Sequence, residues 1–168
     1  MKIFLIGFMG SGKSHWGKIW AGIHKLSFSD LDEVIETTEK KAITKIFEEK
    51  GEEYFREIES ATLHSLANHE NIIIACGGGT PCFHDNMEWM NKNGVTVYLK
   101  ATPEQLVKRL GNEKQKRPIL KNVHDSELEN FIEEKLKGRE SFYNQAKIIL
   151  DIENITVETF KKIVNFQL

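Results

Sequence analysis

A glycine-rich stretch near the start of the chain has the residue types and spacing of a phosphate-binding site. Residues 7–14 read GFMGSGKS and fit the pattern G-x-x-x-x-G-K-[ST]. The apolar run 3–6 before it predicts a strand, and residues 13–25 after it predict a helix, because apolar side chains recur there every three or four positions. Glycines let backbone N–H groups approach an anion, and the helix N-terminus adds partial positive charge. The stretch therefore predicts binding of a nucleoside triphosphate.

Within this loop, two side chains have their own expected roles. Lys13 would reach the β- and γ-phosphates, and the Ser14 hydroxyl would bind Mg²⁺. Gly10, Ser11 and Gly12 would contact the phosphates of ATP. A glycine-rich turn that fits the pattern by chance is the alternative, and the strand before it and the helix after it argue against that.

Two aspartates, Asp30 and Asp32, follow the short predicted strand 26–29. Mg²⁺ prefers oxygen ligands and takes one or two carboxylates while keeping several waters. Asp30 is therefore the expected magnesium partner of Ser14, which leaves Asp32 to meet the group that is phosphorylated. The alternative is an ordinary helix N-terminus, where Asp is favoured in any case.

Three consecutive glycines, 77–79, come directly after the apolar run 72–76. Such a run is typical of a strand buried in a parallel sheet. Since three glycines cost backbone entropy on ordering, they indicate that another group approaches the main chain closely. A plain tight turn would need fewer.

Arginines in three separate segments could face an anion. Arg56 and Glu59 lie three apart on a predicted helix and can form an ion pair, although an exposed pair contributes little. Arg117 lies in a basic loop, and Arg139 precedes Tyr143 by about one helical turn. Each arginine could equally be a surface charge, and the local sequence does not decide between the two.

The order of predicted elements indicates an α/β fold. Further strands are expected at 95–99 and 148–150, and helices at 33–39, 40–68 with a break near Gly51, 85–92, 102–111, 126–143 and 156–166. Alternating strands and helices predict a five-stranded, mostly parallel sheet with helices on both faces. Ligands bind at the carboxyl ends of such strands, where the motifs above lie. The unpatterned basic segment 111–124 is expected to be a mobile lid.

Bulk composition excludes several classes of protein. A chain of 168 residues predicts a single domain, and a net charge of −2 with a pI near 6.3 argues against a nucleic-acid partner. No stretch approaches the roughly 20 apolar residues that span a membrane. Cys76 and Cys82 form no zinc or disulfide pattern, so a reducing cytoplasm is expected. His15 and His24 have no metal-type spacing, and Trp16 is expected in the core. We also expect a monomer.

Taken together, the motifs resemble those of shikimate kinases over essentially the whole chain. They are the loop 7–14, F-S-D-L-D at 28–32, F-R-x-x-E at 55–59, the glycines at 77–79, R-P-I-L at 117–120 and R-x-x-x-Y at 139–143. The resemblance implies a P-loop kinase fold and an ATP-dependent enzyme. It implies transfer of the γ-phosphoryl group to the 3-hydroxyl of shikimate, giving shikimate 3-phosphate and ADP in chorismate and aromatic amino-acid biosynthesis.

The resemblance also implies residue roles. It assigns the shikimate carboxylate to Arg56 and Arg139, and the ring hydroxyls to Asp32 and Gly78, with Gly79 beside them. Asp32 is then the candidate base, and the alternative is that it only orients the hydroxyl. The helices within 33–70 would surround the substrate.

At the nucleotide, the resemblance places Arg117 on the lid facing the phosphates and Arg109 against adenine, with another adenine contact near Asn154. His15 joins the ATP site in place of the family's usual Thr. Thr80 and the two residues after it also depart from the family, which puts the pocket shape rather than the chemistry in question.

Two other functions remain to be weighed. A kinase of another small hydroxylated acid, such as gluconate, would be favoured if Arg56 and Arg139 did not face the cleft. A nucleotide-dependent binding module without catalysis would be expected to lack Lys13, Asp32 or Arg117. All three are present.

Overall fold

Five parallel strands form one sheet in the computed structural model, which describes residues 1–66, 68–111, 120 and 123–166. The strands are β1 (Lys2–Ile6), β2 (Ser27–Asp30), β3 (Ile72–Ala75), β4 (Val95–Lys100) and β5 (Ile148–Asp151). Their order across the sheet is β2-β3-β1-β4-β5, and every neighbouring pair is parallel. The predicted five-stranded parallel sheet is confirmed.

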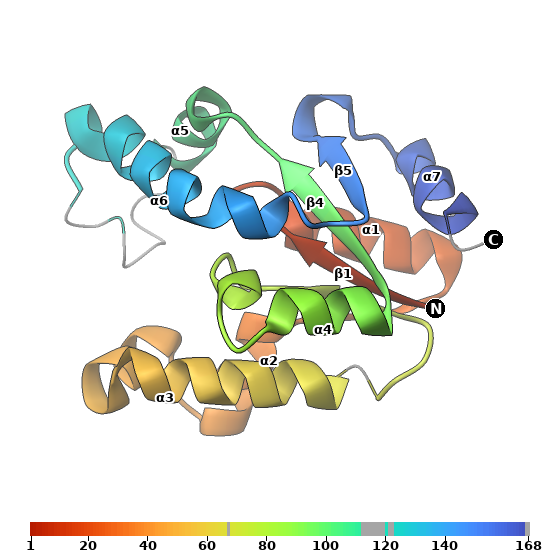
Figure 1. The fold of residues 1–168 in the computed structure, drawn as a ribbon, viewed down its shortest axis with the longest axis horizontal. Helices are drawn as coiled ribbons and strands as arrows, with labels where there is room; N and C mark the ends of the chain where they lie inside the picture. The colour runs from red at the N-terminus through yellow and green to blue at the C-terminus, as the bar shows by residue number, and fades with distance from the viewer. Residues whose placement is uncertain (67, 112–119, 121–122, 167–168) are drawn as a thin grey trace.

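Helices alternate with these strands along the chain (Figure 1). They are α1 (Lys13–His24), α2 (Leu31–Glu39), α3 (Ile43–Leu66), α4 (Asn86–Asn93), α5 (Pro103–Gly111), α6 (Leu128–Tyr143) and α7 (Phe160–Asn165). A short 3₁₀ turn, Thr80–Cys82, follows the three glycines, and others occur at Asp125–Glu127, Ile152–Asn154 and Val157–Thr159. In none of the helices that the structure describes is there an apolar stretch long enough to cross a bilayer.

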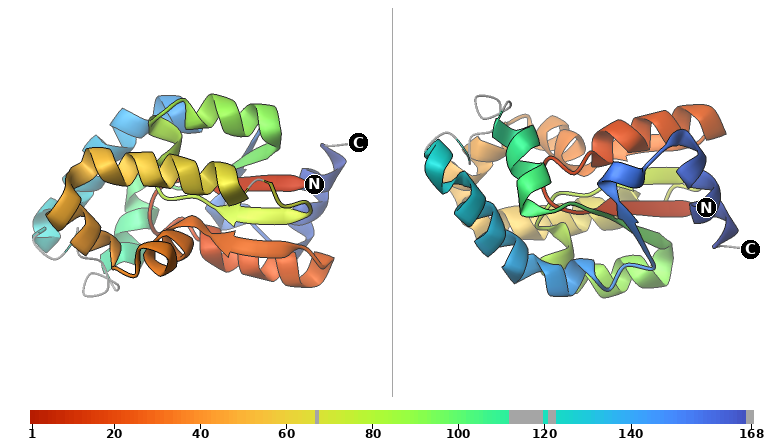
Figure 2. Two further views of the ribbon diagram at one scale, coloured as in Figure 1. Left: turned by 90° about the horizontal axis from the view of Figure 1, so that it is seen from below. Right: turned by 90° about the horizontal axis from the view of Figure 1, so that it is seen from above.

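The sheet is covered on both faces, with α1 and α4 on opposite sides (Figure 2). On the α1 side, Trp20 packs against Phe160 of α7 with ring centroids 5.8 Å apart. On the α4 side, Phe4 of β1 meets Trp89 edge to face at 6.0 Å. Strand β1 is the centre of the core, because its residues 3–6 are fully buried. This burial explains why β1 is uniformly apolar rather than alternating.

Local signals fix the ends of two elements near the cleft. Helix α2 begins at Leu31, two residues before the predicted start, because the Asp30 carboxylate accepts a hydrogen bond from the Asp32 N–H and caps the helix. Helix α3 is interrupted at Gly51, where φ is 81°, as the predicted break requires. The corrected start of α2 places Asp30 at the junction of β2 and α2.

The carboxyl ends of β1, β2 and β3 meet at one edge of the sheet. The phosphate loop follows β1, Asp30 ends β2, and the glycines 77–79 follow β3. Helices α3 and α6 flank this edge (Figure 1). Parallel strands therefore bring together three motifs that are far apart in sequence. Arg117 and most of the predicted lid at 111–124 lie outside the described residues.

Candidate active site

Two glycines of the phosphate loop adopt backbone conformations with positive φ, which glycine reaches without strain. Gly10 and Gly12 have φ of 82° and 95°, and Gly12 stands directly before α1. The Lys13 ammonium donates to the carbonyls of Gly7 at 2.8 Å and Phe8 at 3.0 Å, so it lies over the loop. The loop and the first turn of α1 thus form a cradle with N–H groups and one cation.

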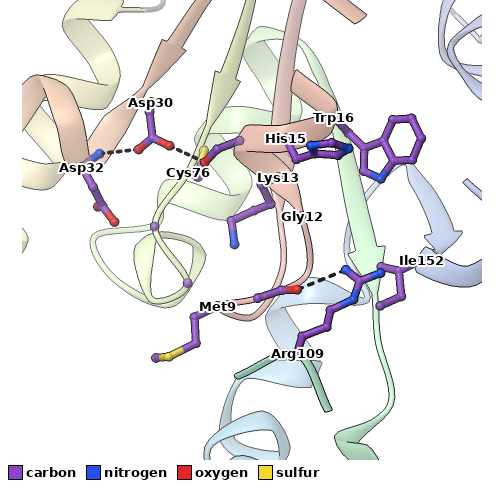
Figure 3. Close-up of a pocket in the computed structure, with 14 residues that line it drawn as sticks. Met9, Gly12, Lys13, His15, Trp16, Asp30, Asp32, Cys76, Arg109 and Ile152 are labelled. Carbon is purple, nitrogen blue, oxygen red and sulfur yellow. Dashed lines mark hydrogen bonds between the residues drawn. The ribbon is translucent and has the colours of Figure 1, made fainter. Parts of the chain in front are cut away.

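A cavity of about 550 Å³ opens in front of this loop, and we call it the loop cavity (Figure 3). Its lining includes Met9, Gly10, Gly12, Lys13, Ser14, His15, Trp16, Asp30, Asp32, Cys76, Gly77, Gly78, Arg109 and Ile152. Arg109, on α5, donates to the Gly10 carbonyl at 3.2 Å. Most predicted nucleotide-binding residues therefore face one space. Ser11 does not line it, because its side chain is fully buried beneath the loop.

Ser14 and Asp30 meet at the floor of the loop cavity. The Ser14 hydroxyl donates to Asp30 Oδ2, while Asp30 Oδ1 accepts from the backbone N–H of Asp32 at 3.1 Å. A hydroxyl and a carboxylate side by side are hard oxygen donors, and such a donor set fits Mg²⁺. The helix-capping alternative is realised, since the same Asp30 carboxylate caps α2.

Asp32 is the second carboxylate of this pair, and its environment is different. Its pKa is raised from the ordinary 3.8 to about 6, chiefly by burial and also by the negative charges of Asp30 and Glu59, whereas Lys13 lowers it. A carboxylate with a pKa near neutrality can both accept and release a proton at the pH of the cell. Asp32 is thus suited to acid–base work, unlike an ordinary surface Asp.

A second cavity, of about 430 Å³, lies between α2, α3, the glycine turn and α6; we call it the α3 cavity. Its lining includes Met9, Asp32, Glu33, Glu36, Ala42, Ile43, Thr44, Phe47, Phe55, Arg56, Glu59, Gly77, Gly78, Gly79 and Arg139. Four residues line both cavities: Met9, Asp32, Gly77 and Gly78. Asp32 therefore stands where the contents of the two cavities would meet.

Arg56 is a buried cation in the wall of the α3 cavity, only 9% exposed. Its Nη1 donates to Glu59 at 2.8 Å, and its Nε and Nη2 donate to Glu52 at 3.2 and 3.1 Å. Because a guanidinium has five N–H donors, these bonds with the described residues leave one N–H each on Nη1 and Nη2. Two donors on one guanidinium can bind a carboxylate.

The turn at 77–79 needs glycine because Arg56 lies directly against it. A Cβ on Gly79 would lie 2.7 to 2.9 Å from Nη2, Nη1 and Cζ of Arg56, which is closer than real Cβ contacts. The near-equal distances mean that the face of the guanidinium covers Gly79. The glycines were expected to admit a close neighbour. At Gly79 that neighbour is the Arg56 side chain of the protein itself.

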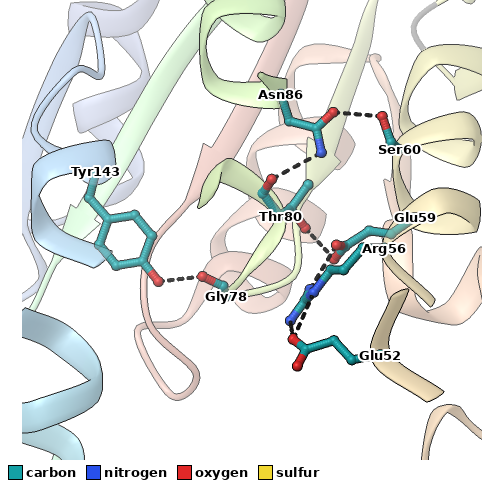
Figure 4. A network of polar contacts seen from close by, with 8 residues as sticks. All are labelled: Glu52, Arg56, Glu59, Ser60, Gly78, Thr80, Asn86 and Tyr143. Carbon is teal, nitrogen blue, oxygen red and sulfur yellow. Dashed lines mark hydrogen bonds and ion pairs between the residues drawn. The ribbon is translucent and has the colours of Figure 1, made fainter. Parts of the chain in front are cut away.

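Arg139 lines the α3 cavity from α6. Its guanidinium carbon lies 5.5 Å from the Phe8 ring centroid, and its Nη1 is 3.1 Å from the position a Cβ on Gly78 would take. One turn later on α6, the Tyr143 hydroxyl donates to the Gly78 carbonyl (Figure 4). The i, i+4 spacing of the two residues places both against the same glycine. Both predicted clamp arginines consequently face the cleft.

Some site residues were not predicted or were predicted differently. Trp16 was expected in the core, but it is half-buried: it stacks on Trp20 at 5.5 Å and also lines the loop cavity. In the sequence, its position about one helical turn after Lys13 indicates that its side chain can lie near the phosphate loop. Ile152, rather than Asn154, lines the loop cavity near Arg109. Glu59 was recognised only as an ion-pair partner.

Comparison with known proteins identifies one family. The family model described as shikimate kinase matches residues 9–167. The shikimate kinase of Parabacteroides distasonis is 49% identical over 94% of this chain and 91% of its own length, and that of Bacteroides thetaiotaomicron is 45% identical over 92% and 89%.

Solved structures agree with the sequence comparisons. The crystal structure of shikimate kinase from Bacteroides thetaiotaomicron superimposes with a TM-score of 0.94 at 41% identity, over 98% of both chains. Shikimate kinase from Acinetobacter baumannii, in complex with shikimate, gives 0.86 at 29% identity, over 99% of this chain and 92% of its own. A gluconokinase from Sinorhizobium meliloti gives only 0.57 at 17% identity, which shows the shared fold alone. The expected ATP-dependent small-molecule kinase is thereby confirmed, and the chain belongs to the shikimate kinase family.

Proposed function

We propose that the two cavities bind ATP and shikimate, and that Asp32 lies between the γ-phosphoryl group and the accepting 3-hydroxyl. The observation that carries this proposal is that Asp32 lines both cavities, with the phosphate loop on one side and two arginines on the other. Phosphoryl transfer depends mainly on positioning and charge stabilisation, so a meeting point of two sites is what the reaction needs.

On the nucleotide side, Lys13 and the backbone of Gly10 and Gly12 bind the β- and γ-phosphates. Arg109 and Trp16 line the part of the loop cavity where the nucleoside would lie. Ser14 and Asp30 are the residues that would hold Mg²⁺. When bound, the metal supplies positive charge that neutralises the phosphates.

On the acceptor side, Arg56 and Arg139 bind the carboxylate of shikimate. Arg56 offers two remaining N–H donors, and charge-assisted pairs of this kind favour a carboxylate held in one orientation. Binding the carboxylate at this end directs a ring hydroxyl toward Asp32 and Gly78. The raised pKa of Asp32 lets it accept the proton of the hydroxyl as the oxygen attacks phosphorus.

Three further parts of the proposal concern the lid arginine, the oligomeric state and the location of the protein in the cell. Arg117 stabilises the transferring phosphoryl group from a lid at 111–124, so Arg117→Ala is expected to lower kcat more than it raises the KM for shikimate. We further propose that the protein acts as a monomer and in the cytoplasm.

The decisive experiment measures ADP release with purified protein, Mg-ATP and a panel of acceptors. Shikimate is expected to be turned over best, and EDTA is expected to abolish the activity. Equal or better turnover of gluconate, or of a nucleoside monophosphate, would overturn the assignment of the acceptor. Product identity is checked by phosphorus NMR, which distinguishes a phosphate ester of the acceptor from simple ATP hydrolysis.

A further inference from the structure

A chain of buried polar side chains leads from Arg56 into the core beneath the glycine turn (Figure 4). Arg56 Nη1 donates to Oε2 of Glu59 at 2.8 Å, and the Thr80 hydroxyl donates to Oε1 of the same carboxylate at 2.6 Å. Glu59 is 1% exposed and Thr80 is fully buried. Since each oxygen of Glu59 has its own donor, the plane of the carboxylate is fixed. The position of the Arg56 Nη1 atom that donates to it is fixed as well.

Two further bonds fix the position of Thr80 itself. The fully buried Asn86 donates from Nδ2 to the Thr80 carbonyl at 3.0 Å and accepts from the Ser60 hydroxyl at 2.8 Å. Ser60 is the neighbour of Glu59 on α3. The network thus starts and ends on the same helix and clamps the turn at 80–82 against it.

The other partner of Arg56 cannot give the same orientation. The Glu52 side chain is 59% exposed, so its ion pair with Arg56 is screened by water. The Glu59 side chain is 1% exposed, and its charge acts at short range in a poorly solvated site. Removing the Thr80 donor would leave one buried oxygen of Glu59 without a partner, which is costly enough to make the carboxylate turn away from its present plane.

From these contacts we propose that Thr80 is a positioning residue for acceptor binding: through Glu59, its hydroxyl sets the orientation in which Arg56 presents its remaining donors to the α3 cavity. Thr80 does not line that cavity, so its effect reaches the acceptor only through Glu59 and Arg56. The inference rests on the proposed role of Arg56 in binding the shikimate carboxylate.

The first test compares Thr80→Val, which keeps the shape and removes the hydroxyl, with Thr80→Ser, which restores it. Thr80→Val is expected to raise the KM for shikimate about tenfold, with the KM for ATP unchanged and kcat within about twofold. Thr80→Ser is expected to recover most of the loss. Thr80→Ala removes the same hydroxyl with a smaller side chain and serves if the valine variant folds poorly.

Thr96→Val is the matched control. Thr96 is also fully buried, and its hydroxyl also donates at 2.6 Å to a side-chain oxygen, that of Asn91, on the α4–β4 side of the molecule. If the effect of Thr80 were only a loss of stability, both valine variants would change the kinetics alike. A raised KM for shikimate in both would overturn the inference.

A double-mutant cycle with Arg56→Ala separates this inference from the proposed function. If Thr80 acts through Arg56, the double variant loses no more shikimate affinity than Arg56→Ala alone, whereas additive losses would contradict the inference. A raised KM in Arg56→Ala with a normal KM in Thr80→Val overturns the inference and leaves the proposed function standing. A normal KM in Arg56→Ala overturns both.

Discussion

Asp30 makes two contacts with different elements through its two carboxylate oxygens: Oδ2 accepts from the Ser14 hydroxyl, and Oδ1 accepts from the backbone N–H of Asp32 at 3.1 Å. One carboxylate therefore links the first turn of α1 to the first turn of α2. The two aspartates also differ in their surroundings, because Asp30 is held by its neighbours while the Asp32 side chain faces both cavities.

The two aspartates are expected to respond differently to magnesium. Asp30→Asn keeps an oxygen that can cap α2 but weakens the metal site, so raised Mg²⁺ is expected to recover part of the lost rate by mass action. Asp32→Asn loses the charge that accepts the proton, with an expected loss of roughly 10²–10⁴-fold in kcat that Mg²⁺ does not restore. The measurement is kcat against Mg²⁺ concentration at saturating shikimate. Rescue of Asp32→Asn but not of Asp30→Asn would mean that the roles are reversed.

The raised pKa of Asp32 predicts a specific dependence of stability on pH. Between 3.8 and about 6 the folded protein binds a proton on Asp32 that the unfolded chain has released, so this residue makes stability fall as pH rises through that window. Asp32→Asn removes the effect and is expected to be more stable than the wild type above pH 6, by about 3 kcal/mol, with the difference vanishing below pH 3.8. Thermal unfolding at a series of pH values measures it; a gain that does not depend on pH would count against the shifted pKa.

Losing either arginine of the α3 cavity is expected to weaken shikimate binding selectively. A charge-assisted hydrogen bond contributes roughly 1.5–3 kcal/mol, so Arg139→Ala is expected to raise the KM for shikimate at least about tenfold while the KM for ATP changes little. Arg56→Lys keeps the charge beside buried Glu59 but loses the paired donors, and it is expected to behave similarly. A defect confined to ATP in either variant would argue against the clamp.

Gly79→Ala tests the close approach of Arg56 to the glycine turn. The added methyl group would overlap the guanidinium, so Arg56 must move, and the KM for shikimate is expected to rise about tenfold or more. Gly138→Ala is the matched control, because a Cβ there meets no described atom within 4 Å, and helix α6 should gain up to about 1 kcal/mol. Steady-state kinetics and thermal unfolding of both variants check this; equal KM values would show that Arg56 does not need its present position.

The indole of Trp16 predicts an optical signal for nucleotide binding. Because it is half-buried in the wall of the loop cavity, a bound nucleotide is expected to change its emission, whereas Trp20 is fully buried. Titration of ATP should therefore change the fluorescence of the wild type, and Trp16→Phe should abolish most of the change. A full signal in Trp16→Phe would assign it to another tryptophan.

The sequence by itself determined the elements and the chemistry that is carried by local motifs. The phosphate loop, the aspartates at the end of β2 and the break at Gly51 each depend on backbone conformation or spacing within a few residues, so their patterns are readable without the fold. Alternation of strands and helices was enough to predict a parallel sheet, because such connections allow few other arrangements.

Only the tertiary structure decided which residues share a cavity and which charges lie close together. The burial of Arg56, the contact of Thr80 with Glu59 and the position of Asp32 between two cavities all join segments 20 or more residues apart in the chain, as does the exposure of Trp16 to the loop cavity. No local pattern carries this information, because burial and the electrostatic field at a side chain depend on what the rest of the chain packs around it. The raised pKa of Asp32 is the clearest case: the sequence places this aspartate at a strand end, but only burial and the nearby charges of Asp30 and Glu59 raise its pKa.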